Sequence, residues 1–163
     1  MLMLDEKPQR DDSLADAQDW LWERIGQGAQ CPCCTQFAKV YRRTLHNGMA
    51  RALIHMYLFR DENDTFRTTS HIITKNGDTA KLRYWGLITD DGGVWKRGRW
   101  RVTRLGEDFV RGRTTVHSHV RIYDGKLLGV YGDRLTIKQA LGTKFDYDEL
   151  MATDGGPGPK EQG

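Results

Sequence analysis

The sequence has no long hydrophobic run and no segment typical of export. No apolar stretch approaches the roughly 18 residues that a membrane-spanning helix needs. The start, Met1 to Leu4, is apolar only briefly before Asp5 and Glu6 follow, whereas a secretory signal is basic first and then apolar for longer. We therefore expect a soluble, cytoplasmic protein.

Familiar catalytic motifs are also missing. The sequence contains no G-x-S-x-G, P-loop or H-E-x-x-H pattern. Asp146, Asp148 and Glu149 form an acidic group near the end of the chain, but they fit a capped helical turn better than a catalytic pair. We expect no enzymatic activity.

Cysteine is scarce and confined to one place, since the three cysteines are Cys31, Cys33 and Cys34. No long loop could be closed by so tight a group, which argues against a disulfide framework. Cys31 and Cys34 have the C-x2-C spacing of a zinc turn. We expect one structural zinc on these two thiolates, with the remaining ligands from Cys33 or from histidines. His117 and His119 are the tentative partners, and His71 is another candidate. Free thiols or a redox pair are the alternatives.

Charge is distributed unevenly along the 163 residues, although the net charge is only +3. Residues 31–113 hold 16 basic and 8 acidic side chains and so carry +8, whereas residues 1–30 carry −4. A concentrated basic block favours a polyanionic partner. An ordinary solvated basic face is the alternative.

The length suits one compact domain with appendages. We divide the chain by composition and turn signals into a disordered arm, an N-terminal helix with the cysteine cluster, a central domain, a hairpin and helix module, and a disordered tail. Their bounds are 1–12, 13–36, 37–113, 114–151 and 152–163.

Capping residues and turns mark the expected elements. Ser13 caps a helix whose apolar positions include Leu14, Ala17, Leu21 and Ile25. A longer helix is expected over 37–59, interrupted near Asn47 and Gly48. The central order is then helix 71–74, turn, helix 79–85, a strand beginning at 87–89 and a turn at 90–93. A stretch rich in β-formers follows over 94–103, with a basic loop tip at 96–99 within it, and then helix 105–111.

The final module is predicted as a β-hairpin followed by short helices. Residues 116–123 alternate between apolar and polar side chains, as a half-buried strand does. Asp124-Gly125 is a hairpin turn signal. Thr136 is expected to cap a helix over 137–141, and residues 145–151 form a last helical turn.

The central stretch resembles winged-helix DNA-binding proteins. The stretches KLRYWGLI and WRVTRLGEDFV carry the resemblance through Leu82, Gly86, Leu87, Ile88, Trp100, Val102, Thr103 and Gly106. It covers residues 68–112. It implies an α+β fold, a winged helix-turn-helix with N-terminal helices and a C-terminal β-hairpin plus short helix.

The whole chain is also similar to a group of small uncharacterised proteins of tailed bacteriophages. The shared features are the CPxC start, the NGMARAL helix, KLRYWGLI and the end FDYDELM. This group implies a bacteriophage setting and brings no established activity with it.

These observations favour a protein that binds duplex DNA, with a regulatory role as the usual consequence. A recognition helix in the major groove and a basic wing on the backbone would supply the contacts. The expected DNA-binding residues are Lys75, Asn76, Thr79, Lys81, Arg83, Lys96, Arg97, Arg99 and Arg101. The alternative is an adaptor or inhibitor that binds a host protein, with Tyr84, Trp85, Trp95 and Trp100 as interface anchors.

Overall fold

The computed structural model describes residues 6–60, 67–68, 77–90 and 99–152. Some predictions fall outside the described residues. These are the helix at 71–74, the contacts Lys75, Asn76, Lys96 and Arg97, the ligand candidate His71, the aromatic Trp95 and the tail from Thr153 onward.

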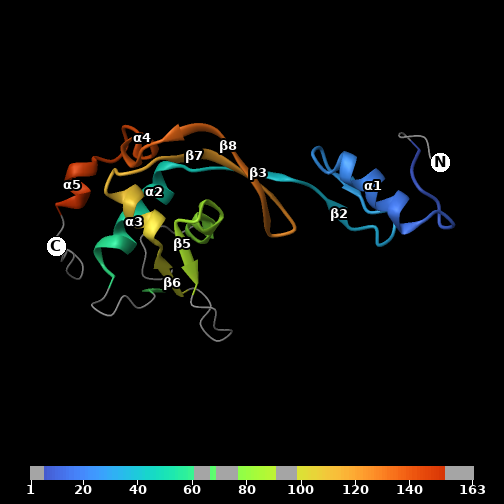
Figure 1. Cartoon of the computed structure of the whole chain (residues 1–163), viewed down its shortest axis with the longest axis horizontal. Helices are drawn as coiled ribbons and strands as arrows, with labels where there is room; N and C mark the ends of the chain where they lie inside the picture. Colours follow the sequence, from blue (N-terminus) through green and yellow to red (C-terminus); the bar gives the residue numbers. More distant parts are fainter. Residues whose placement is uncertain (1–5, 61–66, 69–76, 91–98, 153–163) are drawn as a thin grey trace. The chain divides into compact units, whose positions relative to one another are not determined.

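The chain is a mixed α+β structure, which confirms the predicted class (Figure 1). The helices are α1 (Leu14–Arg24), α2 (Asn47–Leu58), the 3-10 helix η2 (Gly77–Trp85), α3 (Arg104–Val110), α4 (Ile137–Leu141) and α5 (Tyr147–Met151). The strands are β1 (Ala29–Gln30), β2 (Phe37–Ala38), β3 (Tyr41–Thr44), β4 (Arg67–Thr68), β5 (Ile88–Asp90), β6 (Arg99–Val102), β7 (Val116–Tyr123) and β8 (Lys126–Leu135).

The described strands form three small sheets. β1 pairs with β2 antiparallel, and a second sheet has the order β3-β7-β8. The third sheet has the order β4-β6-β5, with both pairs antiparallel and β6 in the centre. Its register places Thr89 opposite Arg101 and Ile88 opposite Val102. Strands β4 and β5 therefore both hydrogen-bond to β6.

The chain divides into two compact units. The first consists of residues Met1–Arg43 and Arg121–Gly129, and the second of Thr44–Val120 and Val130–Gly163. In the first unit the Val40 N–H donates to the Ile25 carbonyl at 2.7 Å. Trp22 there meets Tyr123 edge to face, with ring centroids 5.8 Å apart.

The second unit is built around α2. This helix packs against η2, α3, α4, α5 and β6, and it lies beside α3 in Figure 1. Such surroundings explain why it is apolar on most of its circumference. Its buried residues are Met49, Ala50, Ala52, Leu53, Ile54, Met56 and Tyr57. The helix is therefore the core onto which the shorter elements fold.

The caps predicted at Ser13 and Thr136 are confirmed, because their hydroxyls accept backbone N–H bonds at the starts of α1 and α4. The Thr103 hydroxyl does the same at the start of α3. Gly142 has a positive φ at the end of α4, where glycine is favoured. The alternation of β7 is also confirmed, because its buried residues are Val116, Ser118, Val120 and Ile122.

Three expectations differ from the structure. The helix over 37–59 is wrong in its first half, because residues 37–38 and 41–44 are strands and α2 begins only at Asn47. The segment 79–85 lies inside η2 and is 3-10 helical. Residues 9–12, expected in a disordered arm, form a turn in which Asp12 N–H donates to the Gln9 carbonyl at 3.1 Å.

None of the helices in the described part of the chain has the length and hydropathy that a membrane span requires.

Candidate nucleic-acid interface and arginine pocket

The 3-10 helix η2 presents a different face from the one expected. Thr79, predicted to point outward toward DNA, is only 4% exposed, so that placement is wrong. A 3-10 helix has three residues per turn, so residues three apart lie on one face. Thr79, Leu82 and Trp85 accordingly form one buried row. Arg83 is exposed, and its guanidinium donates to the Tyr84 hydroxyl at 2.9 Å.

Lys81, another expected DNA contact, is paired within its own helix. Its ammonium donates to Asp78 Oδ1 at 2.6 Å, and Asp78 Oδ2 lies 3.1 Å from His46 Nε2. The Gly48 N–H donates to His46 Nδ1, so Nε2 carries the proton and donates to Asp78. Hydrogen bonds from Lys81 and then His46 lower the pKa of Asp78. Asp78 thus ties η2 to the start of α2.

The junction between η2, β5 and α3 depends on one hydroxyl and one glycine. Thr103 donates its hydroxyl to the Gly86 carbonyl at 2.6 Å and accepts the Gly106 N–H at 3.0 Å. The Thr103 N–H donates to the Leu87 carbonyl at 3.0 Å. A Cβ at Gly106 would stand 2.1 Å from that same Leu87 oxygen. This close approach sets where α3 begins relative to the sheet.

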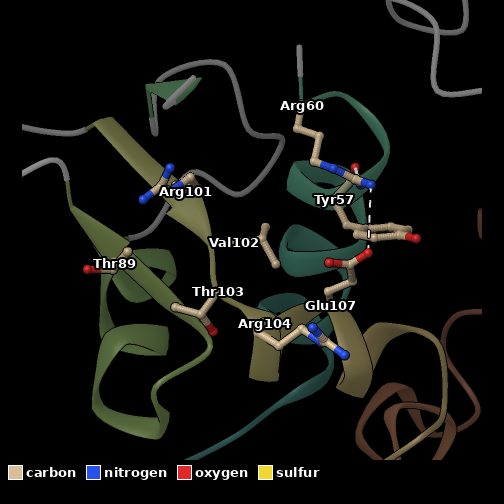
Figure 2. Close-up of a pocket in the computed structure, with 8 residues that line it drawn as sticks. All are labelled: Tyr57, Arg60, Thr89, Arg101, Val102, Thr103, Arg104 and Glu107. Carbon is tan, nitrogen blue, oxygen red and sulfur yellow. Dashed lines mark hydrogen bonds and ion pairs between the residues drawn. The ribbon is translucent and has the colours of Figure 1, made fainter. Parts of the chain in front are cut away.

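An open pocket of about 460 Å³ lies beside Thr103 in the second unit (Figure 2). The end of α2, the paired strands β5 and β6, and the first turn of α3 enclose it. The lining residues are Tyr57, Arg60, Thr89, Arg101, Val102, Thr103, Arg104 and Glu107. Of the predicted DNA contacts it contains Arg101, whose side chain is exposed.

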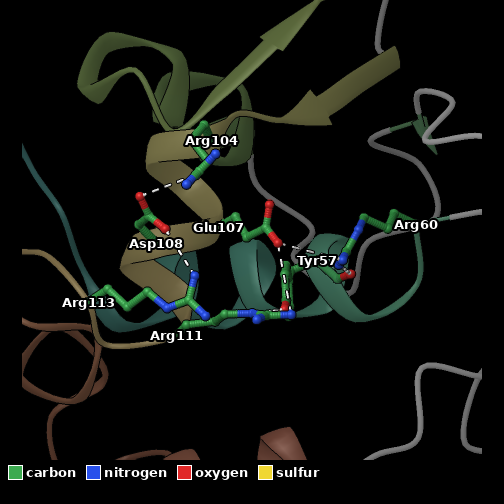
Figure 3. A network of polar contacts seen from close by, with 7 residues as sticks. All are labelled: Tyr57, Arg60, Arg104, Glu107, Asp108, Arg111 and Arg113. Carbon is green, nitrogen blue, oxygen red and sulfur yellow. Dashed lines mark hydrogen bonds and ion pairs between the residues drawn. The ribbon is translucent and has the colours of Figure 1, made fainter.

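A polar network runs along one side of the pocket (Figure 3). Arg60 donates to the Tyr57 carbonyl, and its guanidinium lies 4.1 Å from the Tyr57 ring centre. Arg111 donates to the Tyr57 hydroxyl, and this bond raises the Arg111 pKa. Glu107 is 4.0 Å from Arg60 and 3.9 Å from Arg111. The network therefore holds two arginines against one aromatic ring.

A second pair of arginines meets Asp108. Arg104 lies 3.6 Å from one carboxylate oxygen and Arg113 lies 3.5 Å from the other. The Arg104 side chain is 85% exposed. Exposed ion pairs of this length contribute about 0–1 kcal/mol, so the Arg104 side chain is only weakly held.

The cysteines lie in a turn between β1 and β2. The Cys31 N–H donates to the Gln36 carbonyl at 2.8 Å and the Thr35 N–H donates to the Cys31 carbonyl at 2.9 Å. Backbone N–H groups of Cys34 and Cys33 lower the pKa of the Cys31 thiol, which favours the thiolate that binds metals. The turn brings the Cys34 backbone N–H to the Cys31 thiol.

The histidine partners suggested for zinc have contacts of their own. They share one face of β7, as predicted. His117 Nδ1 lies 3.0 Å from the Gly132 carbonyl, and His119 Nδ1 lies 2.6 Å from Ser118 Oγ. Both histidines belong to the second unit and the cysteines to the first. Within the described ranges, no three histidine, cysteine or acidic side chains gather in a way that would hold a metal. Zinc stays a prediction.

Of the aromatic anchors suggested for a protein partner, Trp85 and Trp100 are buried and Tyr84 is half-buried. Trp85 is 5% exposed and donates its Nε1–H to the His117 carbonyl at 2.7 Å, while Trp100 is 7% exposed. Both side chains belong to the core, which removes them as interface anchors.

Sequence reasoning missed the pocket. Arg60, Arg101 and Arg104 come from three elements, and no spacing in the sequence connects α2 with the other two. The only signal was the basic balance of residues 31–113, which does not say which arginines meet.

Comparison with known proteins gives no relative: no protein-family model, no curated protein and no solved structure matches the chain.

Proposed function

We propose that the chain binds nucleic acid, most favourably duplex DNA, through a winged helix formed by α2, β4, η2, β5 and β6. One observation carries the proposal, namely the strand order β4-β6-β5 with both pairs antiparallel. A winged helix uses this pairing, with its recognition helix just before the second strand and its wing between the second and third. Here η2 precedes β5, and residues 91–98 connect β5 to β6.

Charge supports the same proposal. The stretch from residue 31 to residue 113 carries +8, and Arg83 and Arg101 are exposed on η2 and β6. Duplex DNA is a dense polyanion, so such a surface gains affinity by releasing counterions. The basic side chains at 96, 97 and 99 adjoin or lie in the connection proposed as the wing.

The contact set is narrower than the sequence suggested. Thr79 is removed because it is buried, and Lys81 is assigned to the ion pair with Asp78. Arg83 becomes the principal candidate for a base contact from η2, since a guanidinium can donate two hydrogen bonds to guanine. Lys75, Asn76, Lys96, Arg97, Arg99 and Arg101 remain proposed contacts, chiefly to phosphates. A phage-encoded regulator would need both kinds of contact, because base contacts give sequence preference and phosphate contacts position the protein on the duplex.

Fluorescence anisotropy with labelled duplexes tests the proposal. A random-sequence pool is first enriched for bound duplexes, and the best site is then titrated at several salt concentrations. Affinity should fall steeply with salt. Arg83→Ala should cost about 1–3 kcal/mol against the best site and relax the preference at one base pair. Lys144→Ala, which removes an exposed cation of α4's neighbouring loop, is the control and should leave binding unchanged.

Two outcomes would refute the proposal. One is duplex binding whose affinity does not change with the salt concentration. The other is an Arg83→Ala variant that binds duplexes like the parent but no longer captures a protein from cytosol. The second result would favour the adaptor that the sequence left open.

A further inference from the structure

Three arginines from three elements surround the pocket in Figure 2. Arg60 follows the last turn of α2, Arg101 lies in β6 and Arg104 is the first residue of α3. Glu107 shares this lining. Among the described lining residues, three guanidinium groups therefore stand against one carboxylate.

We propose that this pocket binds the phosphate dianion of a small molecule, either as free inorganic phosphate or as the phosphate monoester of a nucleotide. The proposal goes beyond nucleic-acid binding, because a phosphate monoester is recognised here whether or not the chain binds DNA.

Charge and geometry select this ligand class. A phosphate monoester carries about −1.5 to −2 at pH 7, and the excess of arginines over carboxylates among the described lining residues favours such an anion. A guanidinium fork donates two parallel N–H bonds to phosphate oxygens. Thr89, directly opposite Arg101 in the sheet register, adds a hydroxyl. The volume of about 460 Å³ falls within the roughly 300–1,000 Å³ of small-molecule sites.

Arg60 and Arg104, which lie at helix ends, have N–H donors that can hydrogen-bond to an oxyanion. Arg104 is 3.6 Å from Asp108 and Arg60 is 4.0 Å from Glu107, both longer than the roughly 2.7–2.9 Å of a charge-assisted hydrogen bond. Arg60 is oriented by its bond to the Tyr57 carbonyl and by the Tyr57 ring. The Arg60 guanidinium is therefore already oriented before a ligand binds.

Glu107 is the group that an incoming phosphate must displace. Its Oε1 faces both Arg60 and Arg111. When phosphate takes Arg60, Glu107 can remain paired with Arg111, which is not part of the lining. Neutralising Glu107 would remove this competitor for Arg60. The proposal thus predicts that neutralising Arg104 weakens phosphate binding and that neutralising Glu107 strengthens it.

Isothermal titration calorimetry on the full chain provides the test, with inorganic phosphate and a nucleoside monophosphate as separate probes and chloride as the blank. Arg104→Gln should weaken phosphate binding about tenfold or more, because a charge-assisted hydrogen-bond donor is lost. Arg101→Gln should act likewise. Glu107→Gln should strengthen binding several-fold. Lys144→Gln, an exposed cation outside the lining, should leave it unchanged.

Arg104 is so exposed that its substitution should not unfold the chain, and circular dichroism checks this. The proposal is overturned if neither probe binds saturably, if Lys144→Gln weakens binding as much as Arg104→Gln, or if Glu107→Gln weakens it. It is also overturned if Arg104→Gln affects only duplex DNA, since the pocket would then hold a backbone phosphate. Phosphate binding without DNA binding would sustain this proposal and refute the proposed function.

Discussion

Replacing Gly106 by alanine should destabilise the second unit, even though alanine is the better helix former. An added Cβ would lie 2.1 Å from the Leu87 carbonyl oxygen and 2.8 Å from Val102 Cγ1. The oxygen is a backbone atom, so it cannot rotate away as a flexible side chain would. Relief needs a shift of roughly 1 Å between α3 and the chain at Leu87.

The size of the effect follows from competing terms. Overpacking costs about 1–3 kcal/mol. The shift also strains the bond from Thr103 N–H to the Leu87 oxygen, which contributes about 0.5–1.5 kcal/mol. Alanine returns up to about 1 kcal/mol of helix propensity. The net expectation is a loss of about 2 kcal/mol in the free energy of unfolding.

Urea unfolding followed by tryptophan fluorescence measures this loss, because Trp85 and Trp100 are buried in this unit. Gly129→Ala is the control, since a Cβ there meets nothing within 4 Å and φ is not positive. Gly129→Ala should change the stability by less than about 1 kcal/mol. A Gly106→Ala protein as stable as the parent would show that the contact between α3 and Leu87 does not constrain the fold.

Three further predictions concern the core, an ion pair and the metal. Leu82→Ala should cost about 2–5 kcal/mol through a cavity, because Leu82 is fully buried; urea unfolding measures it, and a loss below 1 kcal/mol contradicts the assignment. The lowered pKa of Asp78 stabilises the fold above the unfolded-state pKa of about 3.9, and this is lost as pH falls through the lower folded-state value. Asp78→Asn should therefore cost about 1 kcal/mol near neutrality and progressively less below about pH 4 in unfolding experiments; a constant difference would refute the linkage. Purified protein should hold about one zinc by metal analysis, and Cys31→Ser or Cys34→Ser should release it and lower the melting temperature; equal melting of metal-free and untreated protein would remove the zinc site.

The elements that the sequence predicted correctly are specified by local chemistry. Thr136 caps α4 together with Gln139, in a reciprocal arrangement that needs only neighbouring residues. The turn at Asp124 and Gly125 has positive φ at both residues, as the dipeptide suggests. The alternation of β7 reports burial of one face. Each signal lies within a few residues of the structure that it specifies.

The elements that were missed depend on distant partners. Strand β3 is exposed at all its residues, Tyr41, Arg42, Arg43 and Thr44, so it has no apolar alternation to detect. It is a strand because it pairs with β7, more than seventy positions later in the sequence. The start of α2 was hidden too, because its cap is the His46 ring, and histidine is not among the preferred capping residues. The arginine pocket was not predicted for the same reason, because its arginines come from elements that are distant from one another in the sequence.

The error at Thr79 has a purely geometric cause that sharpens the functional proposal. At the period of an α-helix, residues 79, 82 and 85 spread over about 120° of the helix surface, and Thr79 can reach solvent while Leu82 is buried. At three residues per turn they lie in one row, and all three are buried. Asp78, Lys81 and Tyr84 form a second row that is half-buried. The third row holds Ala80 and Arg83, so Arg83 is the exposed cation of η2. A base contact from this helix therefore depends on Arg83. Replacing Arg83 should weaken DNA binding more than replacing Lys81.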